Sequence, residues 1–354
     1  MSYLFYEAQR SGPLPADQRV TWRRDSAVND GSDVGHDLTG GYYDAGDHVK
    51  FGFPMAFTAT MLAWGLIEFP NGQAAAGQLD YGRAALKWAT DYFLKAHTSS
   101  FELWGQVGDG YADHGFWGRP EDMTMARPSF KIDSNAPGSD LAGETAAALA
   151  AASMVFAAVD PGYASQALAA ARDLYDFADQ HRLTYDVSIP EAADFYKSWS
   201  GYGDELCWAA LWMNRATGEA SYLTKAREHW DEFGIQYGAE GFNWDDKKGG
   251  LYALYAMLDA DPLFTTTFSD FLDHLRNDKQ YTPGGLIFLD MWGTNRHASN
   301  VAFLGLVGAK MGINSDTNRQ WAEGQINYVL GSYSRSYVVG FGNNPPTRPH
   351  HRSR

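Results

Sequence analysis

Two aspartates three positions apart are the residues best suited to chemistry in this chain. Asp44 and Asp47 lie in the segment Gly-Gly-Tyr-Tyr-Asp-Ala-Gly-Asp-His at residues 40–48. The flanking glycines disfavour a helix and favour a turn. In such a turn both carboxylates can face one water, so that one polarises it and the other accepts its proton without a metal. The alternative is a turn whose aspartates accept hydrogen bonds from local amides, and the tetrapeptide alone favours it.

Two aromatic segments could contact a sugar. His114 and Trp117 lie in a glycine-rich segment at residues 104–118, where the imidazole could bind a hydroxyl while the indole stacks on the apolar face of the ring. Tyr196 and Trp199 precede a predicted helix and repeat this pattern. The alternative is a loop histidine with satisfied hydrogen bonds beside aromatic side chains of the core.

An adjacent acid pair, Asp204 and Glu205, opens that predicted helix. Acids are favourable there because the helix N-terminus carries a partial positive charge. The same pair, with nearby backbone carbonyls, could also chelate Ca²⁺, which prefers oxygen ligands. A third acid would then have to come from elsewhere, and the segment at residues 244–246 offers one.

Two basic segments complete the set of candidate functional residues. Trp292, Arg296 and His297 lie in a predicted helix-entry loop, whose Trp could instead be part of the core. The C-terminal residues include His350 and Arg352. Zinc is disfavoured there because neither an acid nor a Cys follows to complete the ligand shell. Cationic groups directed into a cleft would hold a nearby carboxylate ionised, as a base requires.

The composition excludes several classes of protein. The 354 residues carry a net charge of −15, which disfavours binding to nucleic acid. The 45% hydrophobic content excludes a disordered chain, and the single Cys excludes a disulfide framework and a Cys-based zinc site. No run reaches the roughly 18 apolar residues that a bilayer span needs. The 15% aromatic content suits either a sugar-binding surface or a large core.

Hydrophobic periodicity predicts an all-α fold. Ten helices are expected, at residues 54–69, 80–97, 140–159, 163–182, 203–217, 222–234, 250–259, 262–277, 298–312 and 316–330. Short turns group them into five antiparallel hairpins, and the small residues at 146–152 suit an inner ring. Hairpins around an axis form a toroid, for which six pairs is the familiar closed number. Long loops at 98–139 and 277–297 separate pairs, and the chain at 1–354 is expected to be one domain.

The order of these motifs resembles glycoside hydrolase family 9, the cellulases that include endoglucanases. The resemblance runs from residue 5 to the last residue, and the segments at 44–47 and 342–352 are its most specific parts. It implies an (α/α)6 barrel. It also implies hydrolysis of β-1,4-glucosidic bonds in cellulose or related β-glucans with inversion, by either endo or processive action.

The resemblance also implies roles for individual residues. Asp47 resembles the general base and Asp44 its helper, while His350 and Arg352 match the active-site His-x-Arg. Glucan contacts are implied for His114, Trp117, Tyr196, Trp199, Trp292, Arg296 and His297, although relatives usually carry a Tyr at position 297. A structural Ca²⁺ is implied at the backbone oxygens of Ser200 and Gly201 and the carboxylates of Asp204, Glu205 and Asp245. No organic cofactor is implied.

Family members continue past this point to a Glu that acts as general acid and then to a final helix. The resemblance therefore implies a C-terminally incomplete catalytic domain without its last helix. Inversion needs two carboxyl groups roughly 6.5–9.5 Å apart. The alternative is a non-hydrolytic β-glucan-binding protein or an inactive fragment. A polysaccharide lyase on a similar toroid is disfavoured because the net charge would repel an anionic polymer.

The polymeric substrate implies secretion, although no signal peptide is visible. We expect a monomer without nucleic-acid or membrane partners, compatible with attached carbohydrate-binding modules.

Overall fold

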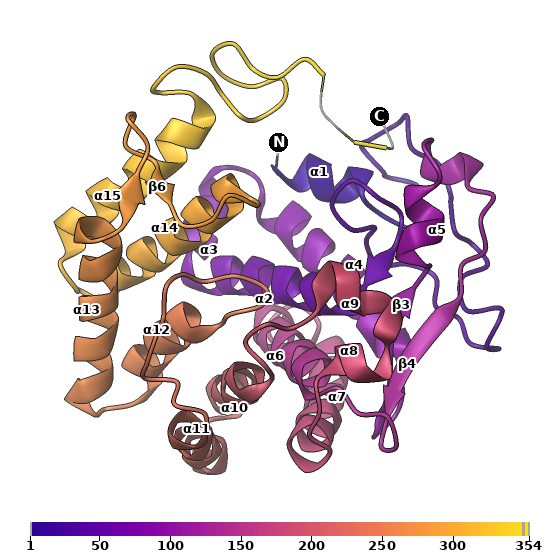
Figure 1. Ribbon diagram of the computed structural model, residues 1–354, viewed down its shortest axis with the longest axis horizontal. Coiled ribbons are helices and arrows are strands. Elements are labelled where there is room, and N and C mark those ends of the chain that lie inside the picture. Colours follow the sequence, from indigo (N-terminus) through magenta and orange to yellow (C-terminus); the bar gives the residue numbers. More distant parts are fainter. Residues whose placement is uncertain (1, 349–350, 353–354) are drawn as a thin grey trace. The chain divides into compact units, whose positions relative to one another are not determined.

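Helices dominate the computed structural model, which describes residues 2–348, 351 and 352 (Figure 1). The chain divides into two compact units, one of residues 1–222 with 351–354 and one of residues 223–350. Each unit is built mainly from helical hairpins, which agrees with the all-α prediction. The prediction of a single domain stays a prediction.

The first unit is built around an alanine-rich helix, α6 (Ser139–Phe156), which packs against α2, α7 and α10. Residues 146–152 of α6 are fully buried. Small side chains allow neighbouring helices to approach α6 from several sides, as the sequence predicted. The longer helices of this unit are α2 (Gly52–Glu68), α4 (Leu79–Ala96), α7 (Pro161–Gln180) and α10 (Gly203–Thr217). The short ones are α1 (Ser2–Ala8), α3 (Pro70–Ala75), α5 (Gly110–His114), α8 (Tyr185–Ser188) and α9 (Ala193–Tyr196), with 3-10 turns at Pro120–Asp122 and Pro190–Ala192.

A small antiparallel sheet in this unit positions the candidate site. Its central strand, β3 (Glu102–Val107), pairs with β1 (Lys50–Phe51), β2 (His97–Ser99) and β4 (Ser129–Asp133). Lys50 lies opposite Val107, so the chain before β1 and the chain after β3 leave the sheet at the same end. These two segments carry Asp47 and His114. From the sequence, residues 98–139 are predicted to be a loop. The strands of this segment are not predicted, because strands this short show no clear alternation of apolar and polar residues.

The second unit contains two helical hairpins. In one, α12 (Lys248–Leu258) packs on α13 (Pro262–Asn277), and in the other α14 (Thr294–Lys310) packs on α15 (Ser315–Leu330). A two-stranded ribbon of β5 (Gln280–Tyr281) and β6 (Ile287–Phe288) precedes α14. Helix α11 (Ala220–Glu232) begins in the first unit and continues in the second.

All ten helices expected from the sequence are present, and the bounds of α10 and α13 agree to the residue. The predicted start of α14, at residue 298, was wrong by four residues. The helix begins at Thr294, so Arg296 and His297 lie in its first turn and not in a loop before it. The entry is abrupt because Gly293 adopts a left-handed conformation with φ of 72°, which costs glycine little.

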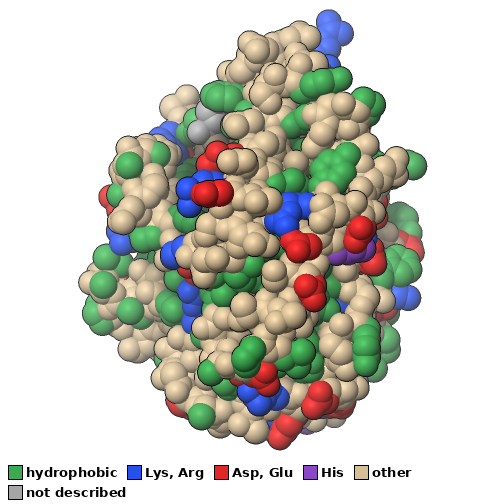
Figure 2. Space-filling model, turned by 90° about the vertical axis from the view of Figure 1, so that its left-hand side faces the viewer, with side chains coloured by type: hydrophobic (Ala, Val, Ile, Leu, Met, Phe, Trp, Pro, Cys, Tyr) green, Lys and Arg blue, Asp and Glu red, His purple; other side chains and the backbone are tan. Residues whose placement is uncertain are grey.

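Charged side chains of both signs are visible on one face of the protein. Acidic and basic side chains are interspersed on the face that Figure 2 shows, so this face offers no continuous basic surface for a phosphate backbone. Within residues 2–348 and 351–352, no helix combines the length and the apolar character that crossing a membrane requires.

The packing of α6 leads to a first prediction. Ala148→Leu inserts a larger side chain at a fully buried position, so we expect the free energy of unfolding to fall by about 1–3 kcal/mol. Ala169→Leu makes the same change at an exposed position of neighbouring α7 and is the matched control. Urea denaturation measures both. Equal midpoints for the two variants would contradict the tight packing around α6.

Candidate active site

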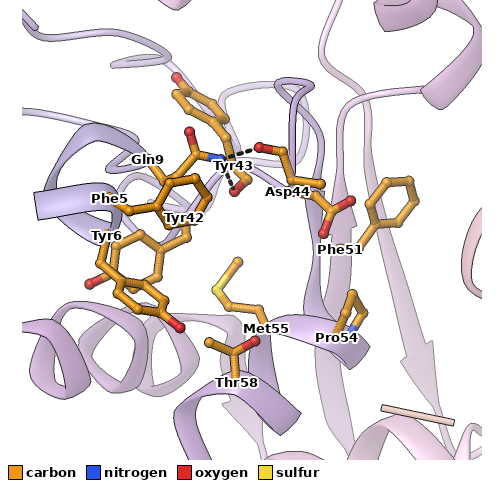
Figure 3. A pocket seen from close by; sticks show the side chains of 11 residues that line it. Phe5, Tyr6, Gln9, Tyr42, Tyr43, Asp44, Phe51, Pro54, Met55 and Thr58 are labelled. Atoms are coloured by element: carbon orange, nitrogen blue, oxygen red, sulfur yellow. Dashed lines mark hydrogen bonds between the residues drawn. The ribbon is translucent and has the colours of Figure 1, made fainter. Parts of the chain in front are cut away.

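The twin aspartates lie on a tight turn that leads into β1. The Asp44 N–H donates to the Val49 carbonyl at 2.9 Å, and the Asp47 N–H donates to the Asp44 carbonyl at 2.9 Å. Ala45 adopts a left-handed conformation with φ of 37°, which is strained for a residue with a Cβ. Gln9, directly after α1, supports this point by donating to the Ala45 carbonyl at 2.6 Å (Figure 3). The sequence prediction of a turn here is confirmed.

The Asp47 carboxylate is nearly buried, with 8% of the residue exposed. One oxygen accepts a hydrogen bond from the Val49 N–H at 3.0 Å, and the other lies 3.6 Å from His114 Nε2. Burial, followed by the charges of Asp44 and Asp113, raises the pKa of Asp47 well above its ordinary value. The hydrogen bond to a local amide that the sequence offered as the alternative is therefore present for Asp47, and the role of this carboxylate as a base stays a prediction.

The Asp44 carboxylate is held by a side chain of helix α9. The Tyr196 hydroxyl at the end of α9 donates to Asp44 Oδ2 at 2.5 Å. Tyr196 is itself fixed, because the Tyr185 hydroxyl donates to its carbonyl at 2.5 Å and its ring lies 4.9 Å from that of Phe51. Sequence reasoning named Tyr196 as a sugar contact, and the structure adds that it orients a carboxylate.

A third carboxylate, Asp113, lies beside the turn and was missed by the sequence analysis. It accepts hydrogen bonds from the His48 N–H at 3.1 Å and from Arg352 Nη1 at 2.8 Å. Arg352 also donates its backbone N–H to the Gly46 carbonyl at 3.2 Å, which places it at the turn. His350 lies outside the described residues. The available signal for Asp113 was its position directly before His114 in the glycine-rich segment.

Oxygens of Asp47 and Asp113 and a ring nitrogen of His114 lie within 4.8 Å of one another, a spacing that could hold a metal ion. Both oxygens of Asp113 already accept hydrogen bonds from His48 and Arg352. The guanidinium of Arg352 thus already supplies positive charge at the position that a metal ion would take. We therefore assign no metal to this group.

Two exposed indoles of the first unit lie shortly after α5 and α9. Trp117 is 55% exposed and lies 6.0 Å from the guanidinium of Arg352, and Trp199 is 75% exposed with Lys197 over its ring at 5.2 Å. Both rings are therefore exposed at the surface, and the alternative of a core Trp is wrong for Trp117. His114 is packed by its ring edge against Phe195, with 5.2 Å between ring centroids.

A pocket lies next to Asp44 and is lined mainly by aromatic and apolar side chains (Figure 3). Phe5, Tyr6 and Tyr42 form one wall, while Met55 and Thr58 of α2 form another. Figure 3 shows Gln9, directly after α1, with its side chain directed toward the turn that carries Asp44. The pocket places apolar surface directly beside the candidate catalytic carboxylates.

The remaining predicted sugar contacts lie in the second unit. Trp292 is 84% exposed, in the segment before α14, so the alternative of a core Trp is wrong there too. Arg296 Nη2 lies 3.1 Å from His297 Nε2, and His297 is buried, with 8% exposed. Burial and the charge of Arg296 lower the pKa of His297, which favours a neutral ring that accepts from the guanidinium.

The acid pair lies in the first turn of α10 and is nearly inaccessible, with Asp204 3% and Glu205 0% exposed. The Ser200 hydroxyl donates to Asp204 Oδ1 at 3.2 Å, and Gly201 turns the chain with φ of 90°. In the second unit, the Asp245 N–H donates to Asn243 Oδ1 at 2.8 Å.

Comparison with known proteins matches the chain to one protein family and to relatives that align with almost all of it. The family model described as "Glycosyl hydrolase family 9" matches residues 1–354. The chain is 50% identical to Endoglucanase B of Cellulomonas fimi, over 99% of this chain and 35% of that protein. It is 47% identical to Endoglucanase 4 of Bacillus sp. (strain KSM-522), over 99% of this chain and 58% of that protein. The chain thus spans between about a third and three fifths of the length of these relatives.

Solved structures agree. The endoglucanase from the termite Nasutitermes takasagoensis superimposes with a TM-score of 0.98 at 60% identity, over 99% of this chain and 81% of that one. Endoglucanase CelQ from Clostridium thermocellum, complexed with cellotetraose, superimposes with a TM-score of 0.89 at 38% identity, over 99% of this chain and 59% of that one. The predicted (α/α)6 barrel fold is confirmed by these neighbours.

The buried charge of Asp47 leads to a prediction about stability. Its pKa is higher in the folded chain than the ordinary value of 3.8, so the folded state binds the proton more tightly and stability falls as the pH rises through that interval. Asp47→Asn stays neutral and keeps an oxygen for the Val49 N–H. We expect it to unfold with a larger free energy than the wild type at pH 7, by about 1.4 kcal/mol per unit of pKa shift.

Chemical denaturation at several pH values tests this expectation. The advantage of Asp47→Asn should disappear below pH 3.8, where the wild-type carboxyl is protonated in both states. Asp231→Asn, at an exposed position of α11, is the control and should show no such trend. A variant that is less stable than the wild type at pH 7 would contradict the buried-charge interpretation.

Proposed function

The chain belongs to glycosyl hydrolase family 9, and we propose that it hydrolyses β-1,4-glucosidic bonds of cellulose or a related β-glucan with inversion of configuration. The observation that carries the proposal is the nearly buried Asp47 carboxylate, which lies on a rigid turn beside Asp44 and His114. The similar proteins include endoglucanases, and the structure of one of them, CelQ, is a complex with cellotetraose.

In this proposal Asp47 is the general base. A water between the two aspartates loses a proton to Asp47 as its oxygen attacks the anomeric carbon from the face opposite the leaving sugar. Asp44, oriented by the hydroxyl of Tyr196, accepts the other proton of the same water in a hydrogen bond. The raised pKa of Asp47 makes it a stronger base than an ordinary carboxylate, provided that it is ionised at the working pH. An inverting hydrolase also uses a second carboxyl group, which protonates the leaving oxygen. Asp47 is proposed as the base.

Sugar rings are held by stacking and by hydrogen bonds. We assign stacking to the exposed indoles of Trp117 and Trp199 and hydroxyl binding to His114. Trp292, Arg296 and His297, in the second unit, stay predicted sugar contacts. Because exposed indoles are sufficient for binding, a non-hydrolytic β-glucan-binding protein is the competing function. Action on an insoluble polymer implies secretion of the protein, and we propose that it acts as a monomer.

The activity test separates these two functions. We expect the chain to release reducing ends from carboxymethylcellulose, and Asp47→Asn to lower kcat by about 10²–10⁴-fold, because general-base catalysis contributes that much. The wild-type rate should fall on the acid side at a pH above the ordinary value of 3.8, since burial raises the pKa of the base.

A pull-down on insoluble cellulose is done in parallel. Asp47→Asn should bind as the wild type does, whereas Trp199→Ala should bind less. Tyr237→Ala, which removes a 72% exposed ring of the second unit, is the control for the loss of a surface aromatic side chain. Binding without reducing ends from the wild type would favour the non-hydrolytic function, and activity retained by Asp47→Asn would remove Asp47 as the base.

We also propose a structural Ca²⁺ at Ser200, Gly201, Asp204 and Glu205 of the first unit, while Asp245, in the second unit, stays a predicted ligand. The donor set fits because all of its atoms are oxygens, which Ca²⁺ prefers. Two adjacent carboxylates that are 3% and 0% exposed lie at the start of α10, and a bound cation would favour their ionised form. When bound, the ion would contribute charge compensation and would link the segment before α10 to the acid pair.

Chelation tests the calcium proposal. Excess chelator should lower the melting temperature of the wild type by several degrees, and added Ca²⁺ should restore it, because a ligand of the folded state stabilises that state. Glu205→Gln should melt at a temperature that no longer depends on Ca²⁺. Glu228→Gln, at an exposed position of α11, should respond as the wild type does. An unchanged wild-type melting curve in chelator would contradict the site.

A further inference from the structure

Asp113 is a buried carboxylate to which neither the proposed chemistry nor the sugar contacts assign a role. It lies near the end of α5 with 1% exposed. Its Oδ1 accepts from the His48 N–H at 3.1 Å and lies 3.3 Å from His48 Nδ1, and its Oδ2 accepts from Arg352 Nη1 at 2.8 Å. Burying a carboxylate is costly, and these hydrogen bonds offset that cost.

Both partners of Asp113 are attached to the catalytic turn. His48 directly follows Asp47 in the chain, and the Arg352 N–H donates to the carbonyl of Gly46, which directly precedes it. Asp113 thus holds the backbone on either side of the candidate base. The His48 carbonyl is held as well, because Arg127 Nη1 donates to it at 2.8 Å.

We propose that Asp113 is a positioning residue for Asp47, which fixes the turn from both sides and keeps the guanidinium of Arg352 beside it. The geometric part of this proposal stands on the contacts above. Its consequence for the reaction rate rests on the proposed function, in which Asp47 is the base.

Asp113 also acts on Asp47 through its charge. Among the described residues, the titratable and charged groups that face Asp47 are Asp44 on the same turn, Asp113 and His114 on α5, and Arg352. Besides burial, the charges of Asp44 and Asp113 raise the pKa of Asp47, and the charge of Arg352 lowers it by less than Asp113 raises it. Removing the Asp113 charge should therefore make Asp47 a weaker base.

Asp113→Asn tests this effect without relying on activity. The full chain with ¹³C-labelled aspartate carboxyls is titrated by NMR, and the Asp47 signal is identified by its loss in Asp47→Asn. We expect the midpoint of Asp47 to fall by about one pH unit in Asp113→Asn, in the range that a neighbouring charge produces. Asp259→Asn is the matched control, because Asp259 is also a buried carboxylate paired with an arginine, Arg227, in the second unit. It should leave the Asp47 midpoint unchanged.

Kinetics measures the positioning role. Asp113→Asn should lower kcat about tenfold with KM unchanged and move the acid limb of the pH profile in the same direction as the NMR midpoint. Asp113→Glu keeps the charge but displaces it, so it should lower kcat while leaving the Asp47 midpoint within a few tenths of a unit. If Asp113→Asn does not fold, Asp113→Glu is the variant that tests the positioning role.

The outcomes are distinguishable. An unchanged Asp47 midpoint in folded Asp113→Asn overturns the inference, even if that variant is less stable, because a merely structural role would affect stability alone. A fall in the midpoint of Asp113→Glu as large as that expected for Asp113→Asn overturns it as well. A wild-type chain without activity but with the expected NMR shifts refutes the proposed function and supports the inference.

Discussion

The pairing of β1 with β3 is the constraint on which the candidate site depends. These strands share only two residue pairs, Lys50 with Val107 and Phe51 with Gln106. Their register nevertheless brings together the turn before β1 and the helix after β3, which are more than fifty residues apart in sequence. A slip of one residue would turn each β1 side chain to the opposite face and separate Asp47 from α5. The catalytic carboxylates, His114 and Asp113 therefore all depend on one short ladder.

That ladder is itself anchored by a buried ion network. The Lys50 ammonium lies 2.8 Å from Asp30 Oδ2, and Arg127 Nε donates to Asp30 Oδ1 at 2.6 Å. Burial lowers the pKa of Lys50 to about 8, so Asp30 offsets part of the cost of its charge at neutral pH. Because Arg127 also holds the His48 carbonyl, the network continues into the catalytic turn. Buried ion pairs contribute little net stability, and here their geometric consequence is the fixed position of the turn.

The sequence predicted the helices better than the site because the two depend on different interactions. Helices such as α10 and α13 are specified within their own segments, by apolar periodicity and by breaks such as Gly218 and Pro262. The turn at Asp44 and Asp47 was likewise readable from its glycines. The strands of the sheet were not, since two to six residues show no period and their pairing is long-range. Asp113 could not be distinguished from other loop acids until that pairing placed it beside Arg352.

The departures from favourable local structure are concentrated at the same turn. Ala45 has a positive φ, Asp47 is a nearly buried carboxylate with a raised pKa, and Asp113 adds a second buried acid. Each of these features lowers stability by itself, and the surrounding hydrogen bonds from Gln9, His48 and Arg352 compensate for part of it. An ordinary solvated turn would relieve this unfavourable charge, but it would also leave Asp47 with the proton affinity of an ordinary carboxylate. The unfavourable charge and the candidate chemistry therefore have one physical origin, the crowding of negative charge on carboxylates that are partly removed from solvent.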